Sequence, residues 1–280
     1  MDKYSLSDDL PPSELITLSG LRPYLARAGR APFEVHQHSF NQIIWFRMGT
    51  GVHLVDFVEH SYGPQTLLYV PHGAVHAFRK DESLDGVLVH FDDVMAMGSS
   101  DGQSLPGILR SLALTSRTLS SAQALQLESC IETLASELSA EDDFGMSTAI
   151  EADLRLLLVR VCRLFRETTE PRSTEYKRYL EFLGLVECHY SEGLSVEEYA
   201  TRLGVSTKTL SRTVHDAASC SPKDVVSERL TLETKRLLVH TDLSVKEIAG
   251  RLGISDASYL TRFFRKQARV TPSAFRASWR

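Results

Sequence analysis

The stretch RLGVSTKTLSR, residues 202–212, returns in altered form as RLGISDASYLTR, residues 251–262. A short amphipathic segment precedes each copy, beginning at Ser195 or Ser244 and carrying a glutamate three positions later. This spacing is typical of a helix start, because serine and glutamate side chains both accept hydrogen bonds from amides left unpaired at the first turn. Each copy therefore predicts a helix, a tight turn and a second helix.

The turns carry the residues that such a unit requires. Gly204 and Gly253 supply the left-handed residue that ends the first helix, and Ser206 and Ser255 are expected to cap the second. Apolar residues recur at helical spacing in both second helices, so the polar side chains between them would face outward. We therefore predict two helix-turn-helix units, at residues 195–217 and 244–267.

The segment between the two units, residues 223–239, has apolar residues at helical spacing and is predicted to be one helix. Its basic residues Arg229, Lys235 and Arg236 are expected to be available to phosphates. The second helix of each unit fits the major groove, and two units on a rigid connection can reach successive grooves about 34 Å apart. The pattern predicts double-stranded DNA as a partner.

Residues 229–275, RLTLETKRLLVHTDLSVKEIAGRLGISDASYLTRFFRKQARVTPSAF, resemble the DNA-binding signature of the AraC/XylS family of bacterial transcription regulators, and the resemblance extends over residues 175–280. It implies an all-α double helix-turn-helix domain. Position by position, it implies DNA contacts by Thr207, Lys208, Ser211 and Arg212 in the first unit and by Ala257, Ser258, Thr261 and Arg262 in the second. For Arg262, the alternative is a salt bridge to a neighbouring acid.

The charge of the chain is unevenly distributed. The net charge is -5, but residues from Glu175 onward contain 17 basic and 13 acidic side chains, which gives +4. Residues 1–174 therefore carry -9. A positive C-terminal part suits a polyanion, whereas the acidic part would be repelled by one.

Before Asp92 the sequence alternates between apolar and polar residues in short segments separated by Gly and Pro, which predicts an antiparallel barrel or sandwich. Four histidines cluster there, and their spacing resembles that of a cupin barrel. The matching positions are His36, His38, Gln42 and His76; His72 lies nearby. Metal-dependent cupins have a glutamate where this chain has Gln42, so a metal site here would be weak and we expect no metal or other cofactor.

We expect these side chains to line a ligand pocket instead, because a neutral imidazole both donates and accepts hydrogen bonds. Strand alternation places Ile44 and Phe46 on the side of Gln42, and Phe78 on the side of His76, as apolar walls. The family resemblance implies a small-molecule effector, and an organic or aromatic acid would fit if Arg47 or Arg79 turned inward. The alternative is a packed barrel with satisfied histidines and no ligand.

From Ser121 onward the apolar spacing becomes helical, in two stretches within residues 121–138 and 150–165. These are either two helices packed on the barrel or the seam of a homodimer. The expected fold class is α+β in two domains, an N-terminal antiparallel cupin-like β-barrel with following helices and a C-terminal all-α double helix-turn-helix. The expected ranges are an effector-sensing barrel at 1–100, a helical dimerisation or linker segment at 101–170, and the DNA-binding domain at 171–280.

The predicted function is that of a sequence-specific DNA-binding transcription regulator, acting as an activator that contacts RNA polymerase and is controlled by a small molecule. The sequence has neither a secretory signal nor an apolar run of bilayer length, so we expect a cytoplasmic protein without a membrane partner. No catalytic triad, phosphate-binding glycine loop or dinucleotide fingerprint occurs, and we expect no catalytic residues and no enzyme activity. Two alternatives remain: a metal-dependent cupin enzyme using His36, His38 and His76 with an accessory helical domain, and a DNA-binding regulator whose barrel only dimerises.

Overall fold

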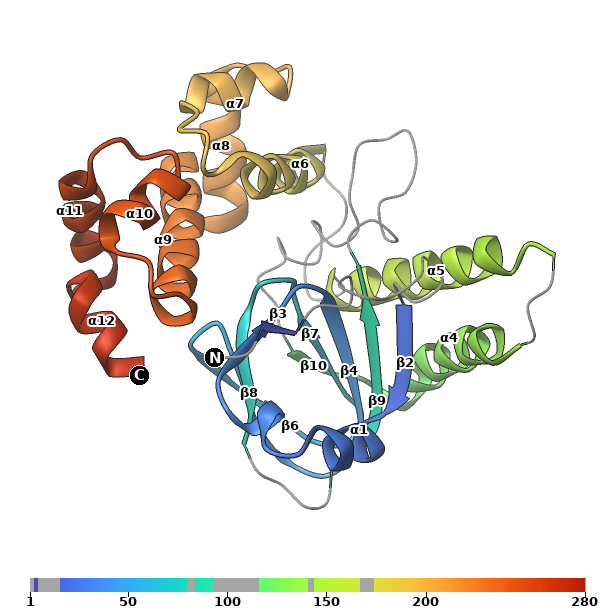
Figure 1. Ribbon diagram of the computed structural model, residues 1–280. Helices are drawn as coiled ribbons and strands as arrows, with labels where there is room; N and C mark the ends of the chain where they lie inside the picture. Colours follow the sequence, from blue (N-terminus) through green and yellow to red (C-terminus); the bar gives the residue numbers. More distant parts are fainter. Residues whose placement is uncertain are drawn as a thin grey trace. The chain divides into compact units, whose positions relative to one another are not determined.

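The chain divides into two compact units, Met1–Thr169 and Glu170–Arg280 (Figure 1). The computed structural model describes residues 3–4, 16–79, 84–92, 116–140, 144–166 and 174–279. The expected boundary between residues 100 and 101 lies outside these ranges. Among the described residues, no helix combines the length and the apolar character needed to cross a membrane.

The first unit contains two five-stranded sheets. One sheet has the order β1 (Lys3–Tyr4), β3 (His36–His38), β8 (Val75–Phe78), β5 (Gly51–Val55) and β6 (Val58–Tyr62). The other has the order β10 (Ser116–Thr118), β7 (Thr66–Val70), β4 (Asn41–Met48), β9 (Asp85–Phe91) and β2 (Ile16–Gly20). All pairs are antiparallel except β1 with β3.

The antiparallel fold is therefore confirmed, but the closed barrel is not what the described residues form. Their hydrogen-bonded ladders build two separate sheets, and none joins a strand of one sheet to a strand of the other. In β6, Glu59, His60 and Ser61 interrupt the apolar pattern. An edge strand needs only one buried face and one ladder, so its sequence signal is weak.

The central strands are apolar on both faces because both faces are covered. In β4, Ile44 and Phe46 pack in the core shared with Phe78 of the other sheet. Ile43 and Trp45 point the opposite way and pack against α4 (Ser121–Ser139) and α5 (Met146–Arg166), which lie beside this sheet in Figure 1. Alternation along one strand therefore builds two apolar layers.

Polar contacts fix α4 on the sheet. The indole Nε1–H of Trp45 donates a hydrogen bond to Glu128 Oε2 at 2.6 Å, and the same carboxylate forms an ion pair with Arg47. On the opposite face of β4, Ile44 packs in the same core as Leu21 of α1 (Leu21–Ala28), which is fully buried. The two predicted helical stretches are thus packed on the sheet, as one of the two interpretations expected.

The second unit is all α-helical, as predicted. Its elements are α6 (Thr174–His189), α7 (Val196–Arg202), α8 (Thr207–Ala218), α9 (Pro222–His240), α10 (Val245–Arg251), α11 (Ala257–Ala268) and α12 (Pro272–Trp279). The two helix-turn-helix units comprise α7 with α8 and α10 with α11. The single helix α9 connects them (Figure 1).

Local signals in the sequence explain most of these helix ends. Ser195 with Glu198 and Ser244 with Glu247 form reciprocal capping boxes. Gly204 and Gly253 have φ of 66° and 70°, the left-handed region in which glycine is favoured.

One predicted cap was wrong. Ser206 caps α8, but α11 is capped by Asp256, whose Oδ1 accepts a hydrogen bond from the Ser258 amide at 2.8 Å, and not by Ser255. The second copy has one more residue between its turn and its second helix, which moves the cap by one position.

We predict that Gly86→Ala destabilises the first unit by about 1–3 kcal/mol, the usual cost of overpacking. A Cβ at Gly86 would lie 2.0 Å from the carbonyl oxygen of Trp45, which the β4–β9 ladder holds in place. Gly63→Ala is the control, because the nearest atom to its Cβ would be Thr50 Cγ2 at 3.9 Å. Urea unfolding followed by Trp45 fluorescence, in a Trp279→Phe background, measures both. Equal stability of the two variants would contradict this packing.

Candidate functional site

The helix α8 presents on one face the four polar side chains that were predicted to contact DNA from the first helix-turn-helix unit. Its opposite face is buried and consists of Leu210, Thr213 and Val214. Because these three positions fill the inward face, the intervening residues point to solvent. The exposed set is Thr207, Lys208, Ser211 and Arg212. The structure therefore brings these side chains together on an accessible helix surface of the kind that reads base edges.

In α11 the predicted residues are less uniformly exposed. Ser258 and Arg262 are exposed, whereas Ala257 and Thr261 are half-buried, and the Thr261 hydroxyl donates to the Ala257 carbonyl at 2.9 Å. The Arg262 side chain is 73% exposed, and its Nη2 lies 3.8 Å from Asp256 Oδ2. The alternative salt bridge is thus present, but so long and exposed a contact contributes little and leaves the guanidinium able to reach a phosphate or a base.

An aromatic side chain that was not predicted from the sequence lies on the same helix. Tyr259 is 51% exposed and its ring stacks on that of Phe263, with 6.2 Å between centroids. Tyr259 lies between Ser258 and Leu260, and adjacent residues of a helix do not share a face. The buried position of Leu260 could therefore have identified Tyr259 as an exposed side chain.

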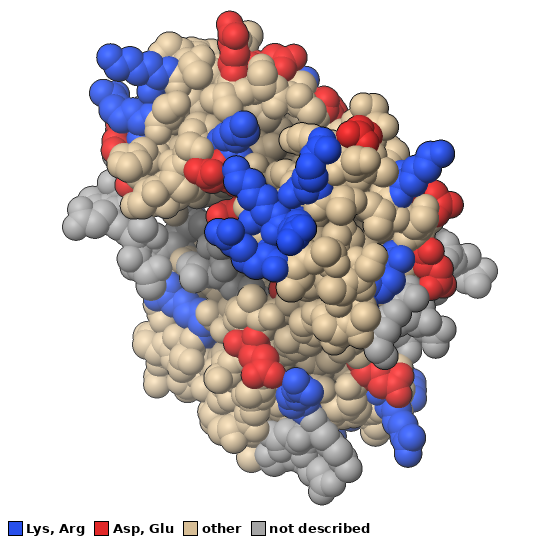
Figure 2. Space-filling model, turned by 90° about the vertical axis from the view of Figure 1, so that its left-hand side faces the viewer, with Lys and Arg blue, Asp and Glu red and all other residues tan. Residues whose placement is uncertain are grey.

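Basic side chains extend the α11 surface. Arg265, Lys266 and Arg269 at its C-terminal end are all exposed. Figure 2 shows Lys and Arg side chains gathered on the side of the helical unit that carries α11. This distribution agrees with the positive charge of the C-terminal part and suits a phosphate backbone.

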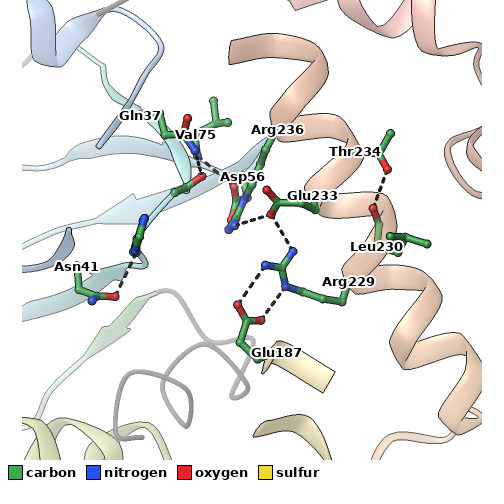
Figure 3. A network of polar contacts seen from close by, with 12 residues as sticks. Gln37, Asn41, Asp56, Val75, Glu187, Arg229, Leu230, Glu233, Thr234 and Arg236 are labelled. Carbon is green, nitrogen blue, oxygen red and sulfur yellow. Dashed lines mark hydrogen bonds and ion pairs between the residues drawn. The ribbon is translucent and has the colours of Figure 1, made fainter. Parts of the chain in front are cut away.

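Two of the three basic residues predicted to contact phosphates from α9 do not lie free at the surface. Arg229 donates from Nε and Nη2 to the two carboxylate oxygens of Glu187, at 2.7 and 3.1 Å, and from Nη1 to Glu233 at 3.0 Å (Figure 3). Arg236 donates to the same Glu233 at 3.4 Å. The prediction for Arg229 and Arg236 was wrong, because both are held in an ion-pair network inside the unit.

Burial alone lowers the pKa of Arg229, but the carboxylates of Glu187 and Glu233 more than offset this, so its pKa is raised above the ordinary value. The guanidinium also lies over the Tyr190 ring, 4.0 Å from its centroid. Lys235 is half-buried, with Nζ 5.7 Å from the centroid of the Phe275 ring. The face of α9 that carries these residues serves the packing of the helices.

A second candidate site lies inside the sheet unit, Met1–Thr169, between the two sheets. The four polar residues predicted there, His36, His38, Gln42 and His76, are all buried. His38 Nε2 lies 3.2 Å from Gln42 Oε1, and the rings of His36 and His38 lie 4.2 and 4.5 Å from that of His76. His72 is exposed instead.

Two further histidines, missed from the sequence, complete this histidine cluster. His90 on β9 lies 3.1 Å from Gln42, and His53 on β5 lies 3.1 Å from His76. Their place in the cluster follows from the pairing of strands, as Gln42 lies opposite His90 in the β4–β9 ladder. The residue pattern along one segment gives no information on that register, so these two histidines could not be predicted from it.

The predicted apolar walls lie next to the histidine cluster. The Phe46 ring stacks on Tyr62 with 4.0 Å between centroids, and the Phe78 ring lies 4.2 Å from that of His53. Neither arginine proposed to turn inward does so. Arg47 pairs with Glu128 on α4, and Arg79 pairs with Glu59 at 3.0 Å, where both side chains are exposed.

The histidine cluster is electrically neutral at pH 7. Burial lowers the pKa of His53 to about 3 and that of His90 to about 4. Burial, reinforced by neighbouring histidines, also lowers the pKa of His38 and His76 well below the ordinary value. His53 Nδ1 and His76 Nε2 are buried without a hydrogen-bond partner among the described residues. The cluster therefore offers hydrogen-bonding capacity that the described protein groups do not use.

Among the described residues, no group of three or more His, Cys, Asp or Glu side chains is arranged to hold a metal ion. The His76 ring lies against the rings of His36, His38 and His53. Such an arrangement can bind a polar, uncharged group, but it provides no fixed positive charge for an anion.

Comparisons with known proteins support the assignment of helix-turn-helix units in the helical part of the chain. A family model described as a helix-turn-helix domain matches residues 199–278. The transcriptional activator RhaS of Klebsiella pneumoniae is 23% identical over 258 residues, covering 89% of this chain and 90% of the relative. RhaS of Citrobacter koseri is 24% identical over 254 residues, with the same coverage. A structure of ToxT from Vibrio cholerae with a bound unsaturated fatty acid is 10% identical, covers 87% of this chain and 89% of that chain, and has a TM-score of 0.43.

The matched range contains both recognition helices, α8 and α11, and the connecting α9 between them. The RhaS relatives align with the sheet unit as well as the helical unit. With that agreement over nine-tenths of the relatives' length, this chain is a DNA-binding transcription regulator similar to those of the AraC/XylS family.

Proposed function

We propose that this regulator activates transcription when a small organic molecule binds in the histidine cluster of its sheet unit. The observation that carries the proposal is the pair of buried nitrogens, His53 Nδ1 and His76 Nε2, that lack a partner among the described residues. A buried polar atom without a partner costs about 1–3 kcal/mol, so a ligand that satisfies it gains affinity. The activating role is taken from the names of the RhaS relatives.

We propose DNA contacts for the residues of both recognition helices. Lys208 and Arg212 of α8 would read bases together with Thr207 and Ser211, because long and short polar side chains share one exposed face. In α11, Arg262 and Ser258 would make polar contacts. Ala257 and Thr261, half-buried, would position the helix or contact a thymine methyl group.

The chemistry of the histidine cluster narrows the class of effector. Neutral imidazoles and the Gln42 amide suit hydroxyl and carbonyl groups, and Phe46 and Phe78 suit an apolar face. An organic or aromatic acid would meet no arginine there. It would bind with uptake of a proton by a histidine, and its affinity would therefore rise as the pH falls.

The effector can shift the regulator only by its unequal affinity for two states. A tenfold to hundredfold change in DNA occupancy requires about 1.4–2.7 kcal/mol of coupling. A few new hydrogen bonds to the histidine cluster are of that size. No covalent step is needed, and we propose that the protein is not an enzyme.

We further propose a homodimer that acts on DNA in the cytoplasm and contacts RNA polymerase as an activator. The surface of α4 and α5 carries exposed apolar side chains, Leu125 at 73% and Leu156 at 47% exposure. Single exposed leucines are common, but two on neighbouring helices fit a helix-to-helix contact between copies.

One specific observation favours a second candidate function, in which the sheet unit only dimerises. Every member of the histidine cluster is buried, and the apolar core beside it is closely packed by Phe46, Tyr62 and Phe78. Isothermal titration of the full chain with small hydroxylated molecules and organic acids separates the two. Binding abolished by His76→Phe supports the effector, and no binding of any kind supports dimerisation alone.

We predict that Arg212→Ala weakens binding to a duplex selected by the wild-type chain about 5- to 150-fold, as expected for loss of a base contact of about 1–3 kcal/mol. Lys177→Ala is the control, because Lys177 is exposed on α6 outside both recognition helices and its loss removes the same charge. Fluorescence anisotropy at two salt concentrations measures both. The DNA contact is absent if the two variants bind alike at each concentration.

We predict that the first unit loses stability as the pH falls below about 6.5. Folded-state pKa values of about 3 for His53 and 4 for His90 lie below the unfolded value of 6.5, so the unfolded chain binds more protons in this window. Each such histidine then costs up to about 1.4 kcal/mol per pH unit, whereas above pH 7 the stability is fully present. Urea unfolding between pH 7.5 and 5 measures the slope. His53→Gln should flatten it and the exposed His72→Gln should not; equal slopes would refute the assignment.

A further inference from the structure

The two helix-turn-helix units have separate hydrophobic cores. Tyr199, Leu210 and Val214 belong to the first, and Ile248, Leu260 and Phe264 to the second. The helix α9 contributes to both, with Val225 and Val226 in the first core and Leu230, Leu237 and Leu238 in the second. If α9 were the only connection, bending of that helix would change the distance and angle between the recognition helices.

Arg229 lies between these two parts of α9 and ties α6 to its middle. Its guanidinium makes a two-point contact with Glu187 on α6, which fixes orientation as well as distance. The third contact is with Glu233, one turn further along α9. These contacts hold α6, whose Phe182 and Val186 belong to the first core, against the middle of α9 (Figure 3).

The chain that follows α6 reaches the second helix-turn-helix unit. Tyr190, under the Arg229 guanidinium, packs against both cores. The carbonyl oxygen of Ser191 lies where a Cβ on Gly253 would be only 2.2 Å away. Gly253 is the turn residue between α10 and α11. The loop between α6 and α7 therefore touches the turn that positions α11.

We propose that Glu187, Tyr190, Ser191, Arg229 and Gly253 form a joint that locks the two recognition helices into one rigid reader, so that the operator must present its half-sites at one spacing. The inference rests on the proposed DNA contacts of both helices. Arg229 acts here as a positioning residue and does not itself contact DNA.

The energetics favour a geometric role for this joint over a simple gain in stability. A buried ion pair can often be replaced by apolar residues with little loss of stability, because its attraction is offset by desolvation. What apolar side chains cannot reproduce is the planar two-point geometry together with the stacked ring. A rigid reader gains affinity because the second half-site binds without further ordering of the protein.

The spacing requirement follows from the geometry of DNA. Each added base pair moves a half-site by about 3.4 Å and rotates it by roughly 35° around the helix axis. A rigid reader cannot follow that rotation, whereas two units on a flexible connection can. The discrimination between spacings is therefore the property that reports the joint.

The experiment uses the full chain and a duplex selected by it from random sequence, with the two half-sites located by hydroxyl-radical footprinting. Three duplexes are compared: the selected spacing, the spacing with two base pairs inserted, and one half-site alone. For the wild type we expect the insertion to reduce affinity at least tenfold. Failure of the wild type to bind any duplex would overturn the DNA contacts themselves, whereas wild-type binding that tolerates the insertion overturns only the joint.

Gly253→Ala inserts a methyl group into the joint, and Gly204→Ala is its matched control. Both positions have positive φ, but a Cβ on Gly204 would meet no atom within 4 Å. We expect Gly253→Ala to lose most of the tenfold discrimination while the affinity for one half-site stays within about twofold of that of Gly204→Ala. Identical discrimination in the two variants overturns the proposal.

Arg229→Lys provides a second, independent variant if Gly253→Ala does not fold. Lysine retains the positive charge between Glu187 and Glu233 but loses the planar fork and the stacking on Tyr190. The expected result is again reduced discrimination between spacings with single half-site binding preserved. Unchanged discrimination, or an equal loss for all three duplexes, contradicts a positioning role.

Discussion

The helical unit depends on one charged side chain held where two small cores meet. The Arg229 guanidinium has carboxylates on two helices and an aromatic ring beneath it, so each of its contacts restricts a different direction of motion. Neither helix-turn-helix unit alone is large enough to constrain the other through apolar packing, because each core contains only a few fully buried side chains. A directional contact at the middle of α9 supplies the constraint that a larger shared core would otherwise provide.

The sheet unit uses polar groups in the opposite way. Its buried imidazoles carry no charge at pH 7, since transfer of the charged form into the space between the sheets would cost more than the local contacts return. Neutral histidines tolerate burial, and each has two ring nitrogens that can serve either as a donor or as an acceptor. The histidine cluster between the sheets is therefore polar without being ionic.

The sequence permitted accurate prediction where structure is determined within a few residues. Ser195 with Glu198, Ser244 with Glu247, and the two turn glycines act locally, and the observed helices begin and end as these signals indicate. Prediction failed where a distant partner decides. Arg229 looked like a phosphate contact because Glu187 lies 42 residues earlier, and no periodicity connects them. His53 and His90 were overlooked for the same reason, since only the pairing of strands brings them to Gln42 and His76. Asp256 replaced Ser255 as a cap because one inserted residue moved the helix start.

A rigid reader restricts how an effector can act on DNA binding. If the distance between α8 and α11 is set inside the helical unit by contacts among its own residues, binding in the sheet unit cannot work by stretching or bending that reader. The proposed effector would then have to change how the intact reader is presented, either as one body or through the arrangement of two copies in the proposed dimer. Control of that kind requires only about 1–3 kcal/mol of differential affinity, because the reader itself has already lost the conformational freedom that binding would otherwise remove.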